Sequence, residues 1–228
     1  MKRIILICSL VVVGLFFAFG GLEGINLNTK DNKTFVTDNN ALYLAEPRIT
    51  LNEFAFEKAG KVAFTNESLK GKWTLFFAGY TFCPDVCPTT LADLDRIYPH
   101  LTNDNNTTTQ VVFVSVDPNR DKAEQLADYV HYFNKNFIGV TSTHKQLWPF
   151  VTQLGLIYGI VEAGDTEGSY LVDHSGSIVL INPEGKLHAT FKSVPNNQGI
   201  NSVDMDLMAE DIKNLQFQYL NETHEGNK

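Results

Sequence analysis

Residues 73–78 read Trp73-Thr74-Leu75-Phe76-Phe77-Ala78, a short run that is almost continuously apolar, and residues 111–116 repeat this character. Short runs rich in β-branched and aromatic residues are typical of strands that are buried on both faces of a sheet. Each run precedes a segment whose apolar residues have helical spacing, at Pro88 to about His100 and at Lys122 to Phe133. We therefore expect βαβ units with right-handed crossovers and a parallel central region.

The pattern changes after a further predicted helix from His144 to Leu154. Two apolar segments, Ser177 to Ile181 and Lys186 to Phe191, flank Asn182-Pro183-Glu184-Gly185. Because proline and glycine occupy favoured turn positions there, these segments predict an antiparallel hairpin. Asp204 to about Leu220 predicts a closing amphipathic helix. A parallel βαβ half followed by a ββα half predicts an α/β, thioredoxin-like fold.

Composition and charge narrow the class of protein. The chain has 228 residues, 43% of them apolar, and a formal net charge of −8. This composition is typical of a globular domain with an appendage and excludes collagen-like and low-complexity chains. Nucleic-acid affinity depends largely on clustered Lys and Arg, and the sequence contains no such cluster, so we expect no nucleic-acid partner.

The first residues differ from the rest of the chain. Lys2 and Arg3 precede a run of uncharged and mostly apolar residues at 4–21. As one helix this run nearly matches the hydrocarbon thickness of a bilayer, and basic residues before it favour a cytoplasmic amino terminus. We expect a single-pass protein of the inner (cytoplasmic) membrane, anchored through residues 4–21, with its carboxy-terminal domain on the periplasmic side. A cleaved signal peptide, ending near Ala18-Phe19-Gly20, is the alternative.

The remaining chain divides by composition. Residues 22–47 are rich in Asn, Thr, Asp and Leu without a sustained period, which predicts a tether between the anchor (1–21) and the domain. Residues 48–220 form the predicted thioredoxin-like domain, and 221–228 form a polar tail. Within the domain, Phe54–Phe56 and Val62–Phe64 predict an extra amino-terminal β-hairpin.

Two cysteines lie where the first buried strand meets its helix, as Cys83-Pro84-Asp85-Val86-Cys87. Pro88 favours a helix start at this point, where unpaired backbone N–H groups and the helix dipole stabilise a thiolate. Two facing thiolates suit Cu(I), zinc or iron–sulfur iron. Zinc or a cluster would need more protein ligands than the chain supplies here, which leaves a site of low coordination number completed by one further donor. A structural disulfide is the alternative interpretation of the pair.

Histidine is the natural third donor. Five of the six histidines lie on predicted helices, on a hairpin strand or in the polar tail, where a solvated, capping or packing role is the default: His100, His131, His144, His188 and His224. His174 lies in Asp173-His174-Ser175-Gly176, immediately before the hairpin. In a thioredoxin-like sheet this connection runs beside the start of the cysteine-bearing helix, so His174 is a candidate ligand, with a satisfied surface histidine as the alternative.

Three segments resemble the signatures of the Sco/SenC copper-chaperone family. They are residues 79–91, which contain the cysteine pair, Val114 to Asp121, and Asp173-His174-Ser175 followed by Asn182 to Gly185. Their order and spacing match the family, and the likeness covers roughly residues 50–220. The departures are mild: Glu184 replaces a frequent Asp, and Lys122-Ala123 replaces a common Thr-Pro. The resemblance does not place any of these positions among the ligands.

The resemblance implies a copper metallochaperone rather than an enzyme. It implies that Cys83, Cys87 and His174 bind copper as Cu(I) or Cu(II), with the cysteines as a redox-active pair. It also implies a role in assembling the binuclear copper centre of cytochrome c oxidase. The expected partners are then the copper-accepting oxidase subunit and either a copper donor or a thiol reductant.

Two other activities use the same dithiol. A thiol–disulfide oxidoreductase would reduce cysteines of an oxidase subunit or another exported protein. Thioredoxin-type oxidoreductases usually have a cis-proline before the hairpin, and residues 173–176 contain no proline. A peroxide-reducing enzyme would need a cysteine of low pKa beside an arginine, and nothing in the spacing selects Arg96 or Arg120 for that role.

Overall fold

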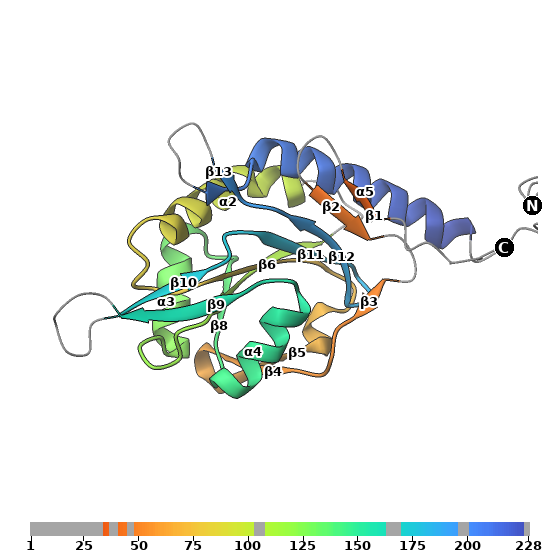
Figure 1. The fold of residues 1–228 in the computed structure, drawn as a ribbon. Helices are drawn as coiled ribbons and strands as arrows, with labels where there is room; N and C mark the ends of the chain where they lie inside the picture. The colour runs from red at the N-terminus through yellow and green to blue at the C-terminus, as the bar shows by residue number, and fades with distance from the viewer. Residues whose placement is uncertain are drawn as a thin grey trace, which may run out of the picture. The chain divides into compact units, whose positions relative to one another are not determined.

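The computed structural model describes residues 34–36, 41–44, 48–102, 108–162, 170–195 and 201–225. Eight strands form its main sheet. They are β1 (Thr34–Val36), β2 (Ala41–Leu44), β3 (Ile49–Thr50), β6 (Trp73–Gly79), β7 (Thr109–Ser115), β8 (Ile138–Val140), β11 (Ile178–Ile181) and β12 (Lys186–Phe191). The strand order is β1-β2-β12-β11-β6-β7-β8, and β3 also pairs with β12 (Figure 1).

The pairing directions confirm the predicted thioredoxin-like fold. Strands β6, β7 and β8 are parallel, whereas β11 is antiparallel to both β6 and β12. Four α-helices connect or follow the strands. They are α2 (Val86–Thr102), α3 (Ala123–Phe133), α4 (His144–Gln153) and α5 (Met205–Glu225). Helices α2 and α3 are the crossovers of the two βαβ units, as the apolar spacing predicts.

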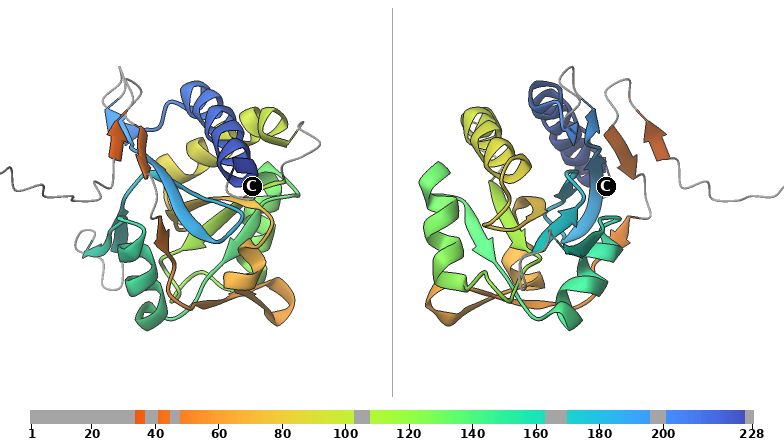
Figure 2. Two further views of the ribbon diagram at one scale, coloured as in Figure 1. Left: turned by 90° about the vertical axis from the view of Figure 1, so that its right-hand side faces the viewer. Right: turned by 60° about the vertical axis from the view of Figure 1, so that its left-hand side comes forward.

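Strand β6 separates two hydrophobic cores. Trp73, Leu75 and Phe77 face one core, which helices α2, α3 and α5 cover, whereas Phe76 and Ala78 face the other. Helix α4 covers the second face together with a hairpin of β4 (Ala55–Lys58) and β5 (Val62–Thr65), as Figure 2 shows. The β4–β5 pairing confirms the predicted extra amino-terminal hairpin. All seven residues of β6 are buried, which explains its nearly unbroken apolar sequence.

A hairpin that follows helix α4 was not predicted. Among the described strands, β9 (Tyr158–Glu162) and β10 (Tyr170–His174) pair only with each other, and both carry exposed apolar side chains. Exposed apolar residues on both strands remove the alternation that normally identifies a half-buried strand. The shorter elements are β13 (Val194–Pro195), β14 (Asn201–Ser202) and the 3₁₀-helices η1 (Ala59–Lys61) and η2 (Asn66–Leu69).

Two segments extend the sheet and its covering beyond the predicted limits. Strands β1 and β2 lie within the predicted tether, and β2 pairs with β12 on the side away from β11, which without this pairing would be an edge of the sheet. An edge strand offers unpaired backbone groups to any neighbouring segment, whatever its side-chain pattern. Helix α5 continues to Glu225, within the predicted polar tail. Residues 32–228 form one compact unit.

The predicted membrane location requires a correction. In the part of the chain that the structure describes, no helix is both long enough and apolar enough to span a bilayer. This finding contradicts the prediction of a single-pass inner-membrane protein. Residues 4–21, on which that prediction and the cleaved-signal alternative depend, lie outside the described residues.

Candidate metal centre

The two cysteines meet because a short loop leads directly from β6 into α2. The backbone N–H of Cys87 donates to Cys83 Sγ over 3.3 Å. This sulfur therefore satisfies a backbone donor in the first turn of the helix, which begins at Val86. Pro88 is tolerated in that turn because its missing N–H would have no partner within the helix.

The two sulfur atoms lie in different environments. Cys83 is half-buried, whereas Cys87 is fully buried. A hydrogen bond from the Cys87 side chain, opposed by burial, lowers the pKa of the Cys83 thiol to about 4. Burial, followed by the interaction with Cys83, raises the pKa of the Cys87 thiol. The metal-free pair thus carries one thiolate, on the more accessible Cys83.

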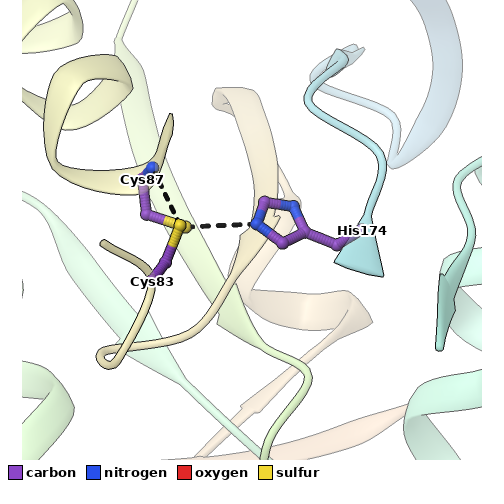
Figure 3. A group of neighbouring side chains, drawn as sticks. All are labelled: Cys83, Cys87 and His174. Atoms are coloured by element: carbon purple, nitrogen blue, oxygen red, sulfur yellow. Dashed lines mark hydrogen bonds between the residues drawn. The ribbon is translucent and has the colours of Figure 1, made fainter. Parts of the chain in front are cut away.

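His174, the last residue of β10, completes the group. Its Nε2 lies 3.3 Å from Cys87 Sγ (Figure 3). Its Nδ1 lies 3.2 Å from the carbonyl oxygen of Ser175, which can only accept a hydrogen bond. Nδ1 therefore carries the proton, and the lone pair of Nε2 faces the sulfurs. The imidazole contacts the rings of Phe77 and Tyr80, with centroid distances of 6.1 Å and 5.9 Å.

The three donor atoms form a compact set. Cys83 Sγ, Cys87 Sγ and a ring nitrogen of His174 all lie within 4.8 Å of one another. Two sulfurs and one imidazole suit a soft, low-coordinate metal ion, and the set contains no carboxylate that would favour a hard ion. A cleft of about 430 Å³, lined by Cys83 and His174 among others, gives access from solvent. The arrangement can therefore hold one soft metal ion and exchange it with a visiting ligand.

Gly79, the last residue of β6, makes room for the buried sulfur. A Cβ atom at this position would lie 2.7 Å from Cys87 Sγ and 2.7 Å from Cε2 of Phe113. Real Cβ atoms do not come this close to such neighbours, so the strand end can approach the helix start only if residue 79 is glycine. The glycine therefore sets how closely Cys87 packs against the sheet.

Asp121, in the loop after β7, forms hydrogen bonds to the segment that carries the cysteines. Gly79 and Ser115 are register partners in the parallel strands β6 and β7, so the loops that follow them meet at one edge of the sheet. The fully buried Asp121 carboxylate accepts hydrogen bonds from the backbone N–H of Thr81 at 2.9 Å and from the Ser115 hydroxyl at 2.6 Å. Sequence reasoning missed this role, although a buried strand followed by two acidic residues was a visible signal.

Two histidines that were not predicted to bind metal lie elsewhere in the described part of the chain. His188 is buried against the rings of Trp73 and Tyr219, and His144 contacts the Tyr158 hydroxyl at 3.0 Å. No group of three or more metal-ligating side chains other than Cys83, Cys87 and His174 occurs among the described residues. Arg96 pairs with Asp206 on the surface.

Comparison with known protein sequences gives a consistent result. The family model described as SCO1/SenC matches residues 44–207. A protein from Stutzerimonas stutzeri that is named for copper binding is 39% identical over 140 residues, which cover 61% of this chain and 68% of that protein. An SCO2-like protein from Rickettsia typhi is 30% identical over 186 residues, covering 82% of this chain and 87% of the relative.

Solved structures with the same fold include copper-bound ones. ScoI of Arabidopsis thaliana with copper bound has a TM-score of 0.63 and 27% identity, and the match covers 74% of this chain and 98% of that structure. The apo Sco1 protein of Thermus thermophilus has a TM-score of 0.61 and 30% identity, with 74% and 95% covered.

Proposed function

This chain belongs to the SCO1/SenC family, and from that premise we propose that it is a copper metallochaperone. It binds one copper ion through Cys83, Cys87 and His174 and delivers that ion to a copper-accepting subunit of cytochrome c oxidase. The proteins most similar to it include one named for copper binding and a structure solved with copper bound. The metal is the cargo of this protein, and no acid–base group is required.

The observation that carries the proposal is the set of donors. Two sulfurs from one short segment and the unprotonated nitrogen of an imidazole from a distant strand converge within 4.8 Å. A structural disulfide would not need His174, and neither cysteine is bonded to the other here. The same donors match the preference of Cu(I) for soft ligands in a site of low coordination number.

The asymmetry between the cysteines suggests the order of transfer. Cys83 is the more accessible donor and faces the cleft, whereas Cys87 is fully buried. A thiolate of the acceptor replaces Cys83 first, and His174 and Cys87 leave the copper afterwards. Each step exchanges one ligand for another, so copper keeps its oxidation state throughout and no external oxidant is consumed.

Thiol–disulfide exchange is not favoured as the main function. Residues 173–176 place a histidine, and no proline, opposite the dithiol. His174 Nε2 faces Cys87 Sγ, where it would compete with an incoming disulfide for the sulfur. This arrangement favours holding a metal ion over exchanging a disulfide.

Metal analysis of the purified, fully reduced protein tests the proposal directly. After reconstitution with Cu(I), we expect one copper per chain, because two sulfurs and one imidazole make one mononuclear site. The control is the Cys83→Ser, Cys87→Ser double variant, which should retain no stoichiometric copper. Retention of zinc in preference to copper, or no copper bound after reduction, would refute the proposal.

Delivery is tested in cells that lack the native protein. His174→Ala leaves the dithiol intact, so we expect this variant to keep thiol–disulfide exchange while cytochrome c oxidase activity falls to the level of the deletion strain. His131→Ala, a histidine outside the donor set, is the matched control and should restore activity. Normal oxidase activity with His174→Ala would mean that delivery does not depend on this ligand.

A further inference from the structure

Arg120 connects the two halves of the donor set. Its guanidinium lies 3.7 Å from the ring centroid of Tyr170 on β10. The guanidinium also lies 4.9 Å from the ring centroid of Phe82 and 5.5 Å from that of Tyr80, and both residues belong to the segment 79–87 that carries the cysteines. One side chain from the loop after β7 therefore contacts the segment of Cys83 and the strand of His174 together.

Hydrogen bonds fix this guanidinium in place. Arg120 Nη1 donates to the backbone carbonyl of Tyr170 over 3.0 Å, and Arg120 Nε donates to Asp117, whose side chain is 1% exposed. The Tyr170 hydroxyl donates to the other carboxylate oxygen of Asp117 over 2.6 Å. Arginine and tyrosine thus share one buried carboxylate, which holds the start of β10 against the loop after β7.

The contacts continue to the ligands themselves. Phe82 immediately precedes Cys83, and the ring of Tyr80 contacts the His174 imidazole almost edge-on, at 86°. Tyr170 begins the strand that ends at His174. We propose that Arg120 is a positioning residue that sets the distance between the cysteine pair and His174. This inference rests on the proposed copper function, because it assigns the residue that makes the histidine an effective ligand.

Arginine is suited to this role for physical reasons. A planar guanidinium stacks on aromatic rings and donates in several fixed directions at once, whereas a lysine ammonium is a compact point charge without a stacking face. The role therefore requires arginine and not merely a positive charge.

A double-mutant cycle on Cu(I) affinity tests the proposal. Groups that orient metal ligands typically contribute about 10- to 100-fold to metal affinity, so Arg120→Gln and Arg120→Lys should each weaken Cu(I) binding at least about 10-fold. In the His174→Ala background the same changes should alter affinity by less than about 2-fold, because the ligand they position is gone. Arg96→Gln, which alters a surface arginine, is the matched control and should leave affinity unchanged.

Three results would overturn the inference. They are an unchanged Cu(I) affinity in Arg120→Gln, a wild-type Cu(I) affinity in Arg120→Lys, and the same loss of Cu(I) affinity on changing Arg120 whether or not His174 is present. If Arg120→Gln does not fold, as circular dichroism would show, Tyr170→Leu removes the stacking ring while keeping the arginine, and the same cycle with His174→Ala applies to it.

A measurement on the metal-free protein separates this inference from the copper function. In Arg120→Gln, backbone amides of β10 should exchange with deuterium faster than in the wild-type chain, whereas amides of β6 should not change. If the wild-type chain binds no copper, the proposed function fails, yet this exchange experiment still reports on the positioning. Unchanged exchange in β10 would show that Arg120 does not hold the strand.

Discussion

The cysteine segment (residues 79–87) and the histidine hairpin (β9 and β10) contribute to one site in contrasting ways. The cysteine segment follows the fully buried central strand β6 and ends in Cys87, which has no exposed surface. The histidine hairpin pairs with no other strand that the structure describes, and Ile160, Val161 and Leu171 are 53%, 50% and 45% exposed. The cysteines therefore pack in or against the hydrophobic core, whereas the imidazole belongs to a hairpin at the periphery of the domain.

This difference indicates that the two regions have different roles in metal binding. The dithiol is placed by short-range geometry, with Cys87 N–H bonded to Cys83 Sγ within one helical turn. The position of His174 depends on contacts far away in the sequence, with Phe77, Tyr80 and Cys87. We expect the cysteines to determine whether metal binds and the histidine hairpin to determine how readily it is released.

The largest effects should separate the two regions in copper affinity. Changing Cys83 or Cys87 to Ser should weaken Cu(I) binding by more than about 100-fold, since it removes one of the two thiolates, which are the softest ligands of the set. His174→Ala should weaken binding by only about 10- to 100-fold, because two thiolates still hold Cu(I). Competition titration with a Cu(I) chelator measures both. Equal losses for all three variants would remove the distinction between the regions.

Glycines in the two regions should respond differently to an added methyl group. Gly79→Ala should lower the free energy of unfolding by about 1–3 kcal/mol and also weaken Cu(I) binding, because the new Cβ displaces Cys87 Sγ. Gly159→Ala in β9 should change stability by less than about 1 kcal/mol, because nothing lies within 4 Å of its Cβ position. Urea unfolding and Cu(I) titration of both variants test this pair. If Gly79→Ala changed neither the free energy of unfolding nor Cu(I) affinity, the close packing of Gly79 against Cys87 would not matter for the site.

A buried histidine outside both regions should make the stability of the fold depend on pH. His188, away from both regions, is buried, and burial together with the charge of Arg48 lowers its pKa to about 3. Below a pH of about 6.5 the unfolded chain binds a proton that the folded chain excludes, so stability should fall as the pH decreases. The contribution of His188 to this slope should be about 1.4 kcal/mol per pH unit between about pH 6 and pH 4. The lowered pKa of the Cys83 thiol adds a contribution of the same sign.

Urea unfolding at several pH values measures this slope. His188→Leu removes this titrating group and keeps a buried apolar side chain between Trp73 and Tyr219, so it should remove the contribution of His188 and make the slope smaller over the same pH range. An unchanged slope in His188→Leu would show that His188 does not cause the loss of stability in acid.

The central sheet and the cysteine pair were predictable from local sequence patterns. Short, continuous apolar runs are typical of strands that are buried on both faces, which predicts β6 and β7. The segments with helical spacing that follow these runs predict α2 and α3 as crossovers between parallel strands. The position of Cys87 in the first turn of the helix was also predictable, because Pro88 favours a helix start at this point.

The groups that surround the cysteine pair depend on long-range packing and were not predictable in the same way. His174 lies 87 residues from Cys87, and its strand belongs to a hairpin whose exposed apolar residues hide the strand period. The support by Arg120 and Asp121 was equally hidden, because it depends on two parallel strands ending at the same edge of the sheet. Contacts of this range are set by packing, and a local pattern records which residues are available but not which of them converge.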